Sequence, residues 1–239
     1  MEWEFVSKKE IKNLLEDLGI QKGYTVLAQV DLSRFSGFID GEQMVIDVLK
    51  ELVGEEGRII VPTFTKNCLD PACLQKIPYK DWDMYRKSIY GFDPKLSSCT
   101  QYSQFGDQFL KNANVIRWSH PVYSFAYWGN VKISQLDKKI NFPISFTNTL
   151  KAFDHTVSVN LLIGLEPEES IMIPALAHLL DFGSIIVQRG KVHSEKRIQM
   201  KDFLHVELNE EEKNRALKYC RIEKKEFKNK NIYLLQLAK

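Results

Sequence analysis

A histidine followed by a proline stands in the segment Arg117-Trp118-Ser119-His120-Pro121. The imidazole of histidine has an unperturbed pKa of about 6.5, so it can accept a proton at neutral pH. We expect His120 where a short strand over 115–117 gives way to a loop, with Pro121 restricting the backbone beside it. A buried histidine bonded to backbone would fit the same pattern, so the residues alone leave both roles open.

Two further titratable residues, His178 and Asp181, are three positions apart. If the helix predicted over 170–180 holds, they share one face of it. They could orient a catalytic group, or they could be an ordinary surface pair at a helix end. No third ligand stands at a local spacing, so we predict no metal site.

A serine- and glycine-rich turn precedes the helix predicted over 44–52, and such a turn presents free N–H groups and the positive end of the helix dipole. These groups suit the phosphates of a cofactor. The residues with groups for such contacts are Ser33, Arg34, Ser36 and Gly37. Asp31 and Asp40 would oppose an anion there, and an ordinary capping turn is the alternative.

Two hydroxyl residues complete the candidate site. Thr63 ends a predicted strand, and ligands of α/β sheets bind beyond the carboxyl ends of such strands. Ser124 follows His120 by four positions and could donate a hydrogen bond to a developing oxyanion. Both hydroxyls could equally serve hydrogen bonding and packing within the fold.

The elements that must position these residues are of the α/β type. A buried strand over 24–30 and another over 58–64 each neighbour an amphipathic helix, which indicates parallel pairing. Ser7 and Glu10 form a capping box for a first helix. We predict a central mixed, partly parallel sheet flanked by helices, in three α/β/α layers. Further predicted strands are 159–165, 185–188 and 232–237, and further predicted helices are 105–110 and 209–220.

Two segments lack a clear period. Residues 66–102 are rich in proline and aromatics and are predicted to be a long irregular, functional segment. The charged residues 222–231 are predicted to be a solvated turn. Neither segment resembles a linker, so residues 1–239 are predicted to form a single domain.

Composition limits the partners. The 33 basic and 31 acidic side chains give a net charge of +2, which favours neither nucleic acid nor a membrane surface. The charged start and the absence of a long apolar run predict a cytoplasmic protein with no membrane anchor. Four cysteines without a paired spacing are expected to be free thiols.

Three segments in this order resemble the aminoglycoside 3-N-acetyltransferase family, the antibiotic N-acetyltransferases. The first contains the strand, turn and helix of residues 26–49 and ends in Pro62-Thr63-Phe64-Thr65. The second is Arg117-Trp118-Ser119-His120-Pro121-Val122-Tyr123-Ser124, similar to the family's Arg-x-x-His-Pro-x-x-Ser. The third is Leu161-Leu162-Ile163-Gly164 with His178 and Asp181 beyond it, similar to a strand ending in glycine and a later His-x-x-Glu.

The resemblance implies an enzyme that moves an acetyl or other acyl group from coenzyme A to a primary amine of an aminoglycoside or amino sugar. It places the catalytic base at His120, and Asp181 is our candidate for the carboxylate that orients it. The implied partners are acetyl-CoA, or another acyl-CoA, and a small amine acceptor, without a metal. A homodimer is left open, as are the acceptor and the acyl chain length.

Two alternatives remain. Cys99 could carry the acyl group as a nucleophile, with His120 as its base. The chain could also be a catalytically inactive binding module, because Gln29-Val30-Asp31-Leu32 stands where the family has His-Ser-Ser-Leu. Whether this altered turn still binds coenzyme A is not decided by the sequence.

Overall fold

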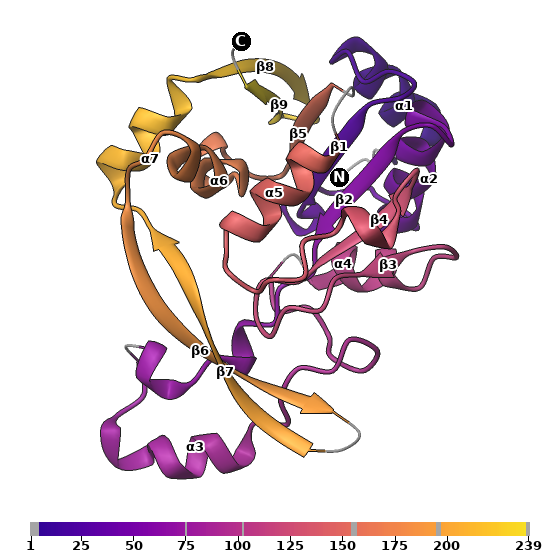
Figure 1. Ribbon diagram of the computed structural model, residues 1–239. Coiled ribbons are helices and arrows are strands. Elements are labelled where there is room, and N and C mark those ends of the chain that lie inside the picture. The colour runs from indigo at the N-terminus through magenta and orange to yellow at the C-terminus, as the bar shows by residue number, and fades with distance from the viewer. Residues whose placement is uncertain (1–4, 75, 102, 154–156, 195–196, 238–239) are drawn as a thin grey trace.

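The computed structural model describes residues 5–74, 76–101, 103–153, 157–194 and 197–237 (Figure 1). Its centre is a seven-stranded sheet in the order β3-β4-β2-β1-β5-β9-β8. The strands are β1 (Thr25–Val30), β2 (Arg58–Pro62), β3 (Ile116–Arg117), β4 (Phe125–Gly129), β5 (Ser158–Ile163), β8 (Cys220–Phe227) and β9 (Lys230–Leu237).

Pairing in the sheet is mixed. β1 runs parallel to both β2 and β5, and the other neighbouring pairs are antiparallel. All residues of β1 are buried, as expected for a central strand covered on both faces. This confirms the predicted partly parallel sheet.

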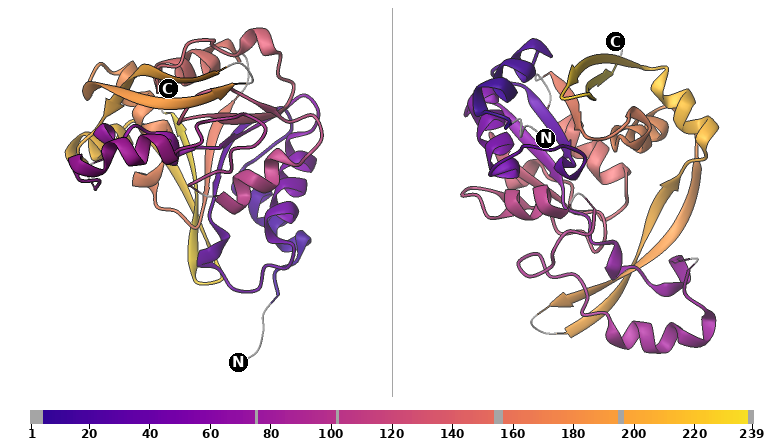
Figure 2. Two further views of the ribbon diagram at one scale, coloured as in Figure 1. Left: turned by 90° about the horizontal axis from the view of Figure 1, so that it is seen from below. Right: turned by 180° about the vertical axis from the view of Figure 1, so that it is seen from behind.

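Helices cover both faces of the sheet (Figures 1 and 2). On one face, α1 (Lys8–Asp17), α2 (Gly41–Val53) and α4 (Ser103–Leu110) bury their apolar residues against Val26, Ala28 and Val30 of β1. On the other face, α5 (Ile144–Ala152) and α6 (Met172–Leu179) pack in a cluster that includes Leu27 of β1, and α7 (Glu210–Leu217) packs against α6. The three-layer α/β/α prediction is therefore confirmed.

Local signals explain where helices begin. The Ser7 N–H donates to the Glu10 carboxylate at 2.8 Å, and the Glu10 N–H donates back to the Ser7 hydroxyl, which is the predicted capping box of α1. In α6, Pro174 lies in the first turn, where a missing N–H breaks no intrahelical bond. The predicted helix over 170–180 is confirmed, and it starts two residues later.

The segment predicted to be irregular contains more structure than expected. It includes three short 3₁₀ turns, the second of them η3 (Pro71–Cys73), and the helix α3 (Trp82–Ser88). Arg86 of α3 forms a two-pronged ion pair with the buried Asp70, at 2.8 and 2.9 Å. This pair ties α3 to the rest of the segment, although α3 itself has no buried residue.

Strands β6 (Ser184–Ser194) and β7 (Arg197–Glu207) form a separate two-stranded ribbon, far longer than the strand predicted over 185–188. The ribbon runs from the α6–α7 side of the domain past α3 (Figures 1 and 2). The Lys191 ammonium donates to the carbonyls of Arg86 and Ile89, both at 2.6 Å, and so joins the ribbon to α3.

The prediction of a solvated turn over 222–231 is wrong. Most of this segment is β8 and the start of β9, and a short turn connects the two strands. β8 is an edge strand whose six central residues are exposed, so lysine and glutamate side chains can point into solvent from it. Charges on an edge strand also discourage pairing with other chains.

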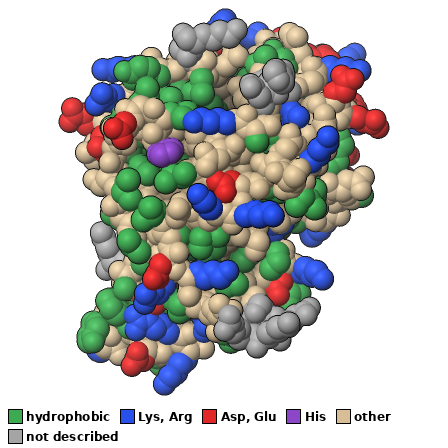
Figure 3. Space-filling model, in the orientation of Figure 1, with side chains coloured by type: hydrophobic (Ala, Val, Ile, Leu, Met, Phe, Trp, Pro, Cys, Tyr) green, Lys and Arg blue, Asp and Glu red, His purple; other side chains and the backbone are tan. Residues whose placement is uncertain are grey.

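The surface carries both signs of charge. Basic and acidic side chains are interspersed with apolar ones on the face in Figure 3. Among the described residues, no helix combines the length and the apolar composition needed to cross a bilayer.

Candidate active site

His120 is completely buried and lies in the loop between β3 and β4. Its Nε2 lies 2.6 Å from the carbonyl oxygen of Ile140, and its Nδ1 accepts hydrogen bonds from the N–H groups of Val122 (3.0 Å) and Tyr123 (2.8 Å). The ring is therefore a neutral tautomer with the proton on Nε2. Burial lowers the pKa of His120 to about 3. In this geometry the ring holds the 120–123 turn in place, and both nitrogens are occupied by backbone.

The two residues predicted to assist His120 lie elsewhere. His178 is half-buried at the end of α6, and Asp181 is exposed with a left-handed backbone, φ +56°. Within the described chain no hydrogen bond or ion pair joins either side chain to His120, whose partners are all backbone groups. The structure does not bring the three predicted catalytic residues together, and their roles stay predictions.

Thr63 and Ser124 do come together, but in the interior. Their hydroxyl oxygens are 3.0 Å apart, and the Ser124 hydroxyl donates to the Thr63 carbonyl at 2.6 Å. The Arg117 guanidinium donates to the same carbonyl at 2.9 Å and to the Ser97 carbonyl at 2.6 Å. Both hydroxyls are fully buried, so this cluster fastens the 92–100 segment to the sheet.

The predicted cofactor turn forms a 3₁₀ turn, η1 (Leu32–Arg34). Asp31 accepts hydrogen bonds from both the N–H and the hydroxyl of Ser33, and it lies 3.5 Å from Arg34. Arg34 also lies 3.5 Å from Glu169. Ser36 and Gly37 follow, and the Gly37 carbonyl accepts from the Val6 N–H. The acidic neighbours already occupy much of the hydrogen-bonding capacity of the turn.

A cleft of about 330 Å³ lies beyond the carboxyl ends of β2 and β5, where ligands of α/β sheets bind. Its walls come from the segment after β2, from η6 (Pro167–Glu169) and α6, from β7 and from α7. The aromatic part of the wall consists of Phe64, Tyr123 and Phe142. The cleft therefore combines an apolar interior with a polar rim.

His205 of β7 lies in the wall of this cleft. Its ring stacks on Tyr123, with centroids 4.8 Å apart and planes at 8°, and on Phe142 at 5.7 Å. The Nδ1 atom is buried and has no hydrogen-bond partner among the described residues. Burial and the positive charge of Lys66 lower the pKa of His205 to about 4. Both histidines are therefore neutral at pH 7, but His205 lines the cleft and His120 does not.

The charged groups of the cleft are few. Lys66 follows β2, and desolvation lowers its pKa. Glu168, Glu169 and Glu207 are exposed at the rim. Lys213 of α7 also lines the cleft, but its ammonium is 2.6 Å from Glu210.

Buried amides fix the floor of the cleft. The Gln29 side chain donates to the Glu169 carbonyl at 3.0 Å and accepts from the Ile171 N–H at 2.8 Å. The side-chain oxygen Oδ1 of Asn160 accepts from the Ser170 hydroxyl at 2.5 Å, and its Nδ2 donates to the Leu27 carbonyl at 2.8 Å. Both amides are fully buried, so the loop from β5 to α6 is fixed to the sheet.

The Cys99 thiol does not fit a nucleophile. It is 5% exposed, and burial together with Asp107 raises its pKa to about 12, so almost no thiolate exists at neutral pH. The described part of the chain also holds no cluster of three or more histidine, cysteine, aspartate or glutamate residues that could bind a metal ion.

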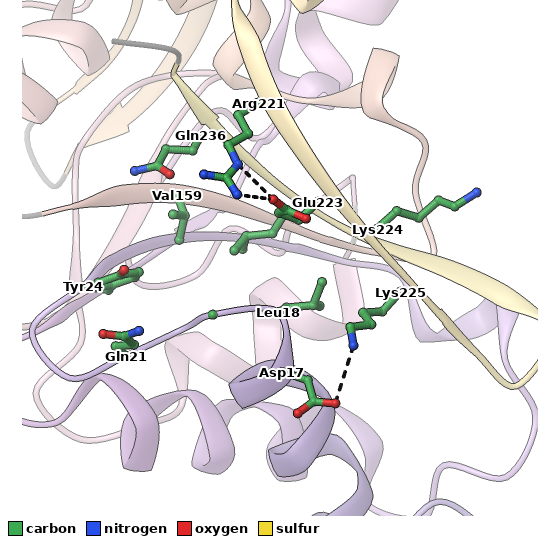
Figure 4. A pocket seen from close by; sticks show the side chains of 12 residues that line it. Asp17, Leu18, Gln21, Tyr24, Val159, Arg221, Glu223, Lys224, Lys225 and Gln236 are labelled. Carbon is green, nitrogen blue, oxygen red and sulfur yellow. Dashed lines mark hydrogen bonds and ion pairs between the residues drawn. The ribbon is translucent and has the colours of Figure 1, made fainter.

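A second pocket, of about 350 Å³, lies near the amino ends of β1 and β5, under β8 and β9 (Figure 4). Arg221 pairs with Glu223 at 2.7 Å and Lys225 with Asp17 at 3.6 Å across its wall. Of the residues that the structure describes, neither a histidine nor a cysteine lines it. Two of its charged side chains, Asp17 and Glu223, are already ion-paired within the pocket.

Sequence reasoning missed His205. The weak signal was the alternation Phe203-Leu204-His205-Val206, in which positions 203 and 205 point to one face of a strand. Only the three-dimensional fold shows that this face meets the residues after β2.

Comparison with known proteins gives a consistent result. A sequence model of the family described as aminoglycoside 3-N-acetyltransferase matches residues 27–239. The chain is 27% identical over 209 residues to the SPbeta prophage-derived aminoglycoside N(3')-acetyltransferase-like protein YokD of Bacillus subtilis, covering 86% of this chain and 77% of YokD. The crystal structure of YokD superposes with a TM-score of 0.82 at 26% identity, covering 98% of this chain and 90% of YokD.

Two further relatives agree. Aminoglycoside N(3)-acetyltransferase IX of Micromonospora chalcea is 30% identical over 126 residues, which are 52% of this chain and 44% of that enzyme. The structure of AAC-IIIb in a binary complex with CoASH has a TM-score of 0.75 at 17% identity, covering 98% of this chain and 92% of AAC-IIIb. At that identity the similarity concerns the fold.

Proposed function

Because the chain belongs to the aminoglycoside 3-N-acetyltransferase family, we propose that it transfers an acyl group from coenzyme A to a primary amine. The observation that carries this proposal is the family match over residues 27–239, which includes every strand and wall of the cleft except the start of β1. The proposed reaction centre is the cleft beyond β2 and β5. We further propose that the chain works as one domain, because the ribbon supplies one wall of that cleft.

The cleft has the size and lining that this reaction needs. Its volume of about 330 Å³ suits the thioester end of a pantetheine arm and the reacting amine, with the nucleotide outside. Phe64, Tyr123 and Phe142 would exclude water from the thioester. Excluding water strengthens electrostatic interactions with the charge that develops on the carbonyl oxygen.

The acceptor that we propose is a cationic amino sugar or aminoglycoside. The exposed carboxylates of Glu168, Glu169 and Glu207 at the rim would attract its protonated amines. For the outer part of coenzyme A we keep the turn from Ser33 to Gly37 as the candidate. Arg34 of that turn reaches Glu169 of the cleft rim, and this contact supports the assignment.

The test is an acyl-transfer assay with a panel of amines that includes aminoglycosides and simple amino sugars. Acetyl-CoA is the donor, and release of free thiol is the readout. We expect thiol release that depends on both the amine and the protein. In parallel, thermal unfolding with coenzyme A at about 100 times its dissociation constant should show about 2.7 kcal/mol of stabilisation.

A catalytically inactive binding module is the second candidate, and the enclosure of His120 favours it. The residue that the family resemblance marks as the base is sealed by backbone hydrogen bonds. Stabilisation by coenzyme A without thiol release for any amine would support this second candidate.

A further inference from the structure

Among the described residues, one imidazole faces the proposed reaction centre, and it belongs to the ribbon rather than to the central sheet. His205 is half-buried, lines the cleft and lies between the aromatic wall and the rim. His178, His193 and His120 do not line this cleft. Of the histidines in the described residues, His205 is therefore the one within reach of a molecule bound there.

The surroundings of His205 hold its ring without using its nitrogens. Tyr123 and Phe142 stack on the ring nearly in parallel, at 8° and 15°, and so fix its plane. The β7 backbone beside it is fixed as well, because the Phe142 N–H donates to Leu204 and the Val206 N–H donates to Phe142. Neither ring nitrogen bonds to another described residue, and Nδ1 is buried. Since Nδ1 is shielded from solvent, Nε2 is the ring nitrogen that a molecule bound in the cleft can reach.

The charges around His205 come from several elements. The titratable groups that face it or share its cleft are Lys66 after β2, Tyr123 and His120 from the loop between β3 and β4, Glu168 and Glu169 of η6, Glu207 of β7, and Lys213 of α7. Lys66 has no carboxylate partner within the described chain, whereas Lys213 is paired with Glu210. The cation that acts on the imidazole is therefore Lys66, and it favours the neutral, proton-accepting ring.

We propose that His205 is the residue that takes the proton from the acceptor amine, with the Lys66 ammonium facing the carbonyl oxygen of the thioester. This inference rests on the proposed acyl transfer. The amine nitrogen forms a bond to the thioester carbon, and the C=O electron pair moves to oxygen beside Lys66. A proton passes from the amine nitrogen to the His205 imidazole. The C=O bond re-forms, the C–S bond breaks, and the leaving sulfur takes that proton, so the products are an amide and a free thiol.

Other groups of the cleft are less suited to this step. The Tyr123 hydroxyl donates to the Gln188 side chain at 2.9 Å, and burial raises its pKa far above neutral. The rim carboxylates are exposed and lie where they can bind the cationic acceptor. A base must also reach the reacting nitrogen. His205 lines the cleft, and its Nε2 makes no hydrogen bond to a described residue.

The pH dependence follows from the neutral state of the ring. Because burial and Lys66 lower the pKa of His205 to about 4, the imidazole stays deprotonated well below the ordinary histidine value. We therefore expect the decrease of kcat/KM on the acidic side of the pH profile to be centred near pH 4 rather than near pH 6.5. Activity should fall as the pH drops through that range.

The experiment compares His205→Gln and His205→Ala with the unaltered chain in the thiol-release assay. The matched control is His193→Gln on the same ribbon, because His193 also stacks on a tyrosine, Tyr90, at 4.1 Å but lies outside the cleft. We expect kcat to fall at least about 100-fold in both His205 variants and less than about 2-fold in the control. Coenzyme A should still stabilise the His205 variants against heat, and added imidazole should restore part of the turnover of His205→Ala.

The outcomes separate the two claims. If His205→Gln keeps near-normal turnover while the unaltered chain is active, the inference is wrong and the proposed function stands. If the unaltered chain binds coenzyme A but releases no thiol with any amine, the acyl transfer is refuted, and the inference is refuted with it. Loss of turnover together with loss of coenzyme A binding in the His205 variants would assign the residue to binding and also overturn the inference.

Discussion

Two regions of the molecule, the 120–123 turn and the ribbon wall at His205, each present a histidine against the same tyrosine. The ring centroid of Tyr123 is 5.5 Å from that of His120 and 4.8 Å from that of His205. His120 gives both nitrogens to the backbone, while His205 gives neither to any described residue. A histidine in a sequence motif typical of catalysis need not be accessible to a substrate, and a catalytic base must be accessible.

The difference arises from how each histidine is enclosed. His120 precedes a proline in a tight turn, so the turn's own N–H groups reach its Nδ1. His205 stands in a strand, where backbone groups pair with the neighbouring strand and leave the side chain to the surface that it faces. The arrangement at His120 stabilises the fold, whereas the arrangement at His205 leaves the imidazole facing the cleft.

The largest effect on stability is expected for His120→Ala. This change leaves the N–H groups of Val122 and Tyr123 and the Ile140 carbonyl buried without partners, each costing about 1–3 kcal/mol. We expect the free energy of unfolding in urea to fall by about 3–5 kcal/mol. His205→Ala, which removes only ring stacking, should cost about 1 kcal/mol. Equal losses of stability in the two variants would contradict the claim that His120, unlike His205, stabilises the fold.

The next effect concerns pH. Folding lowers the pKa of His120 from 6.5 to about 3, so as the pH falls the unfolded chain binds a proton that the folded chain does not. This contribution to stability is complete above about pH 6.5 and is lost at about 1.4 kcal/mol per pH unit towards pH 3. The free energy of unfolding, measured in urea at pH 7, 5 and 4, should decrease less steeply with falling pH in His120→Gln than in the unaltered chain.

The same measurement distinguishes the second histidine. The pKa of His205 is lowered only to about 4, so its contribution should end there. Removing His205 should leave the loss of stability between pH 4 and pH 3 unchanged. A change in that interval would contradict the assignment of the deeper shift to His120.

A smaller effect is expected for Tyr123→Phe, which keeps the ring between the two histidines. The change removes the hydrogen bond from the tyrosine hydroxyl to Gln188, at 2.9 Å, and should cost about 1–2 kcal/mol in urea unfolding. Turnover should change less than about 3-fold, because this hydroxyl is not the proposed proton acceptor. A loss of 100-fold would transfer the catalytic role from His205 to Tyr123.

The smallest effect is expected for Asp181→Asn. Its side chain is exposed and makes no hydrogen bond or ion pair with another described residue, so stability should change by less than about 0.5 kcal/mol. Turnover and its pH profile should be those of the unaltered chain. A shifted profile would instead revive Asp181 as the partner of a catalytic histidine.

Much of the fold could be predicted because local and global signals agree in its first third. The strand over 24–30 and the helix over 44–52 are buried and periodic, and each ends at a turn residue. The capping box at Ser7 was visible for the same reason. The sequence did not predict helix α5, because serine and threonine alternate with apolar residues along it and no clear apolar face results. Its buried face includes Ser145, Thr147 and Thr149.

The site was harder to predict, because its wall joins segments that are distant in sequence. His205 meets Phe64 and Glu168 only through the path of the ribbon, and no local pattern encodes that meeting. His120 was singled out by its sequence neighbours, but the enclosure of its ring depends on Ile140, twenty residues later. The residue types were readable, whereas their accessibility was not.

The ribbon begins and ends at one place. Ser184 pairs with Glu207, so the chain leaves the body after α6 and re-enters it before α7 through adjacent residues. Because the hairpin is closed at its base, it can change in length or sequence without any change in the order of the sheet strands. Under the proposed function, the ribbon residues other than His205 are therefore the positions at which acceptor preference can diverge.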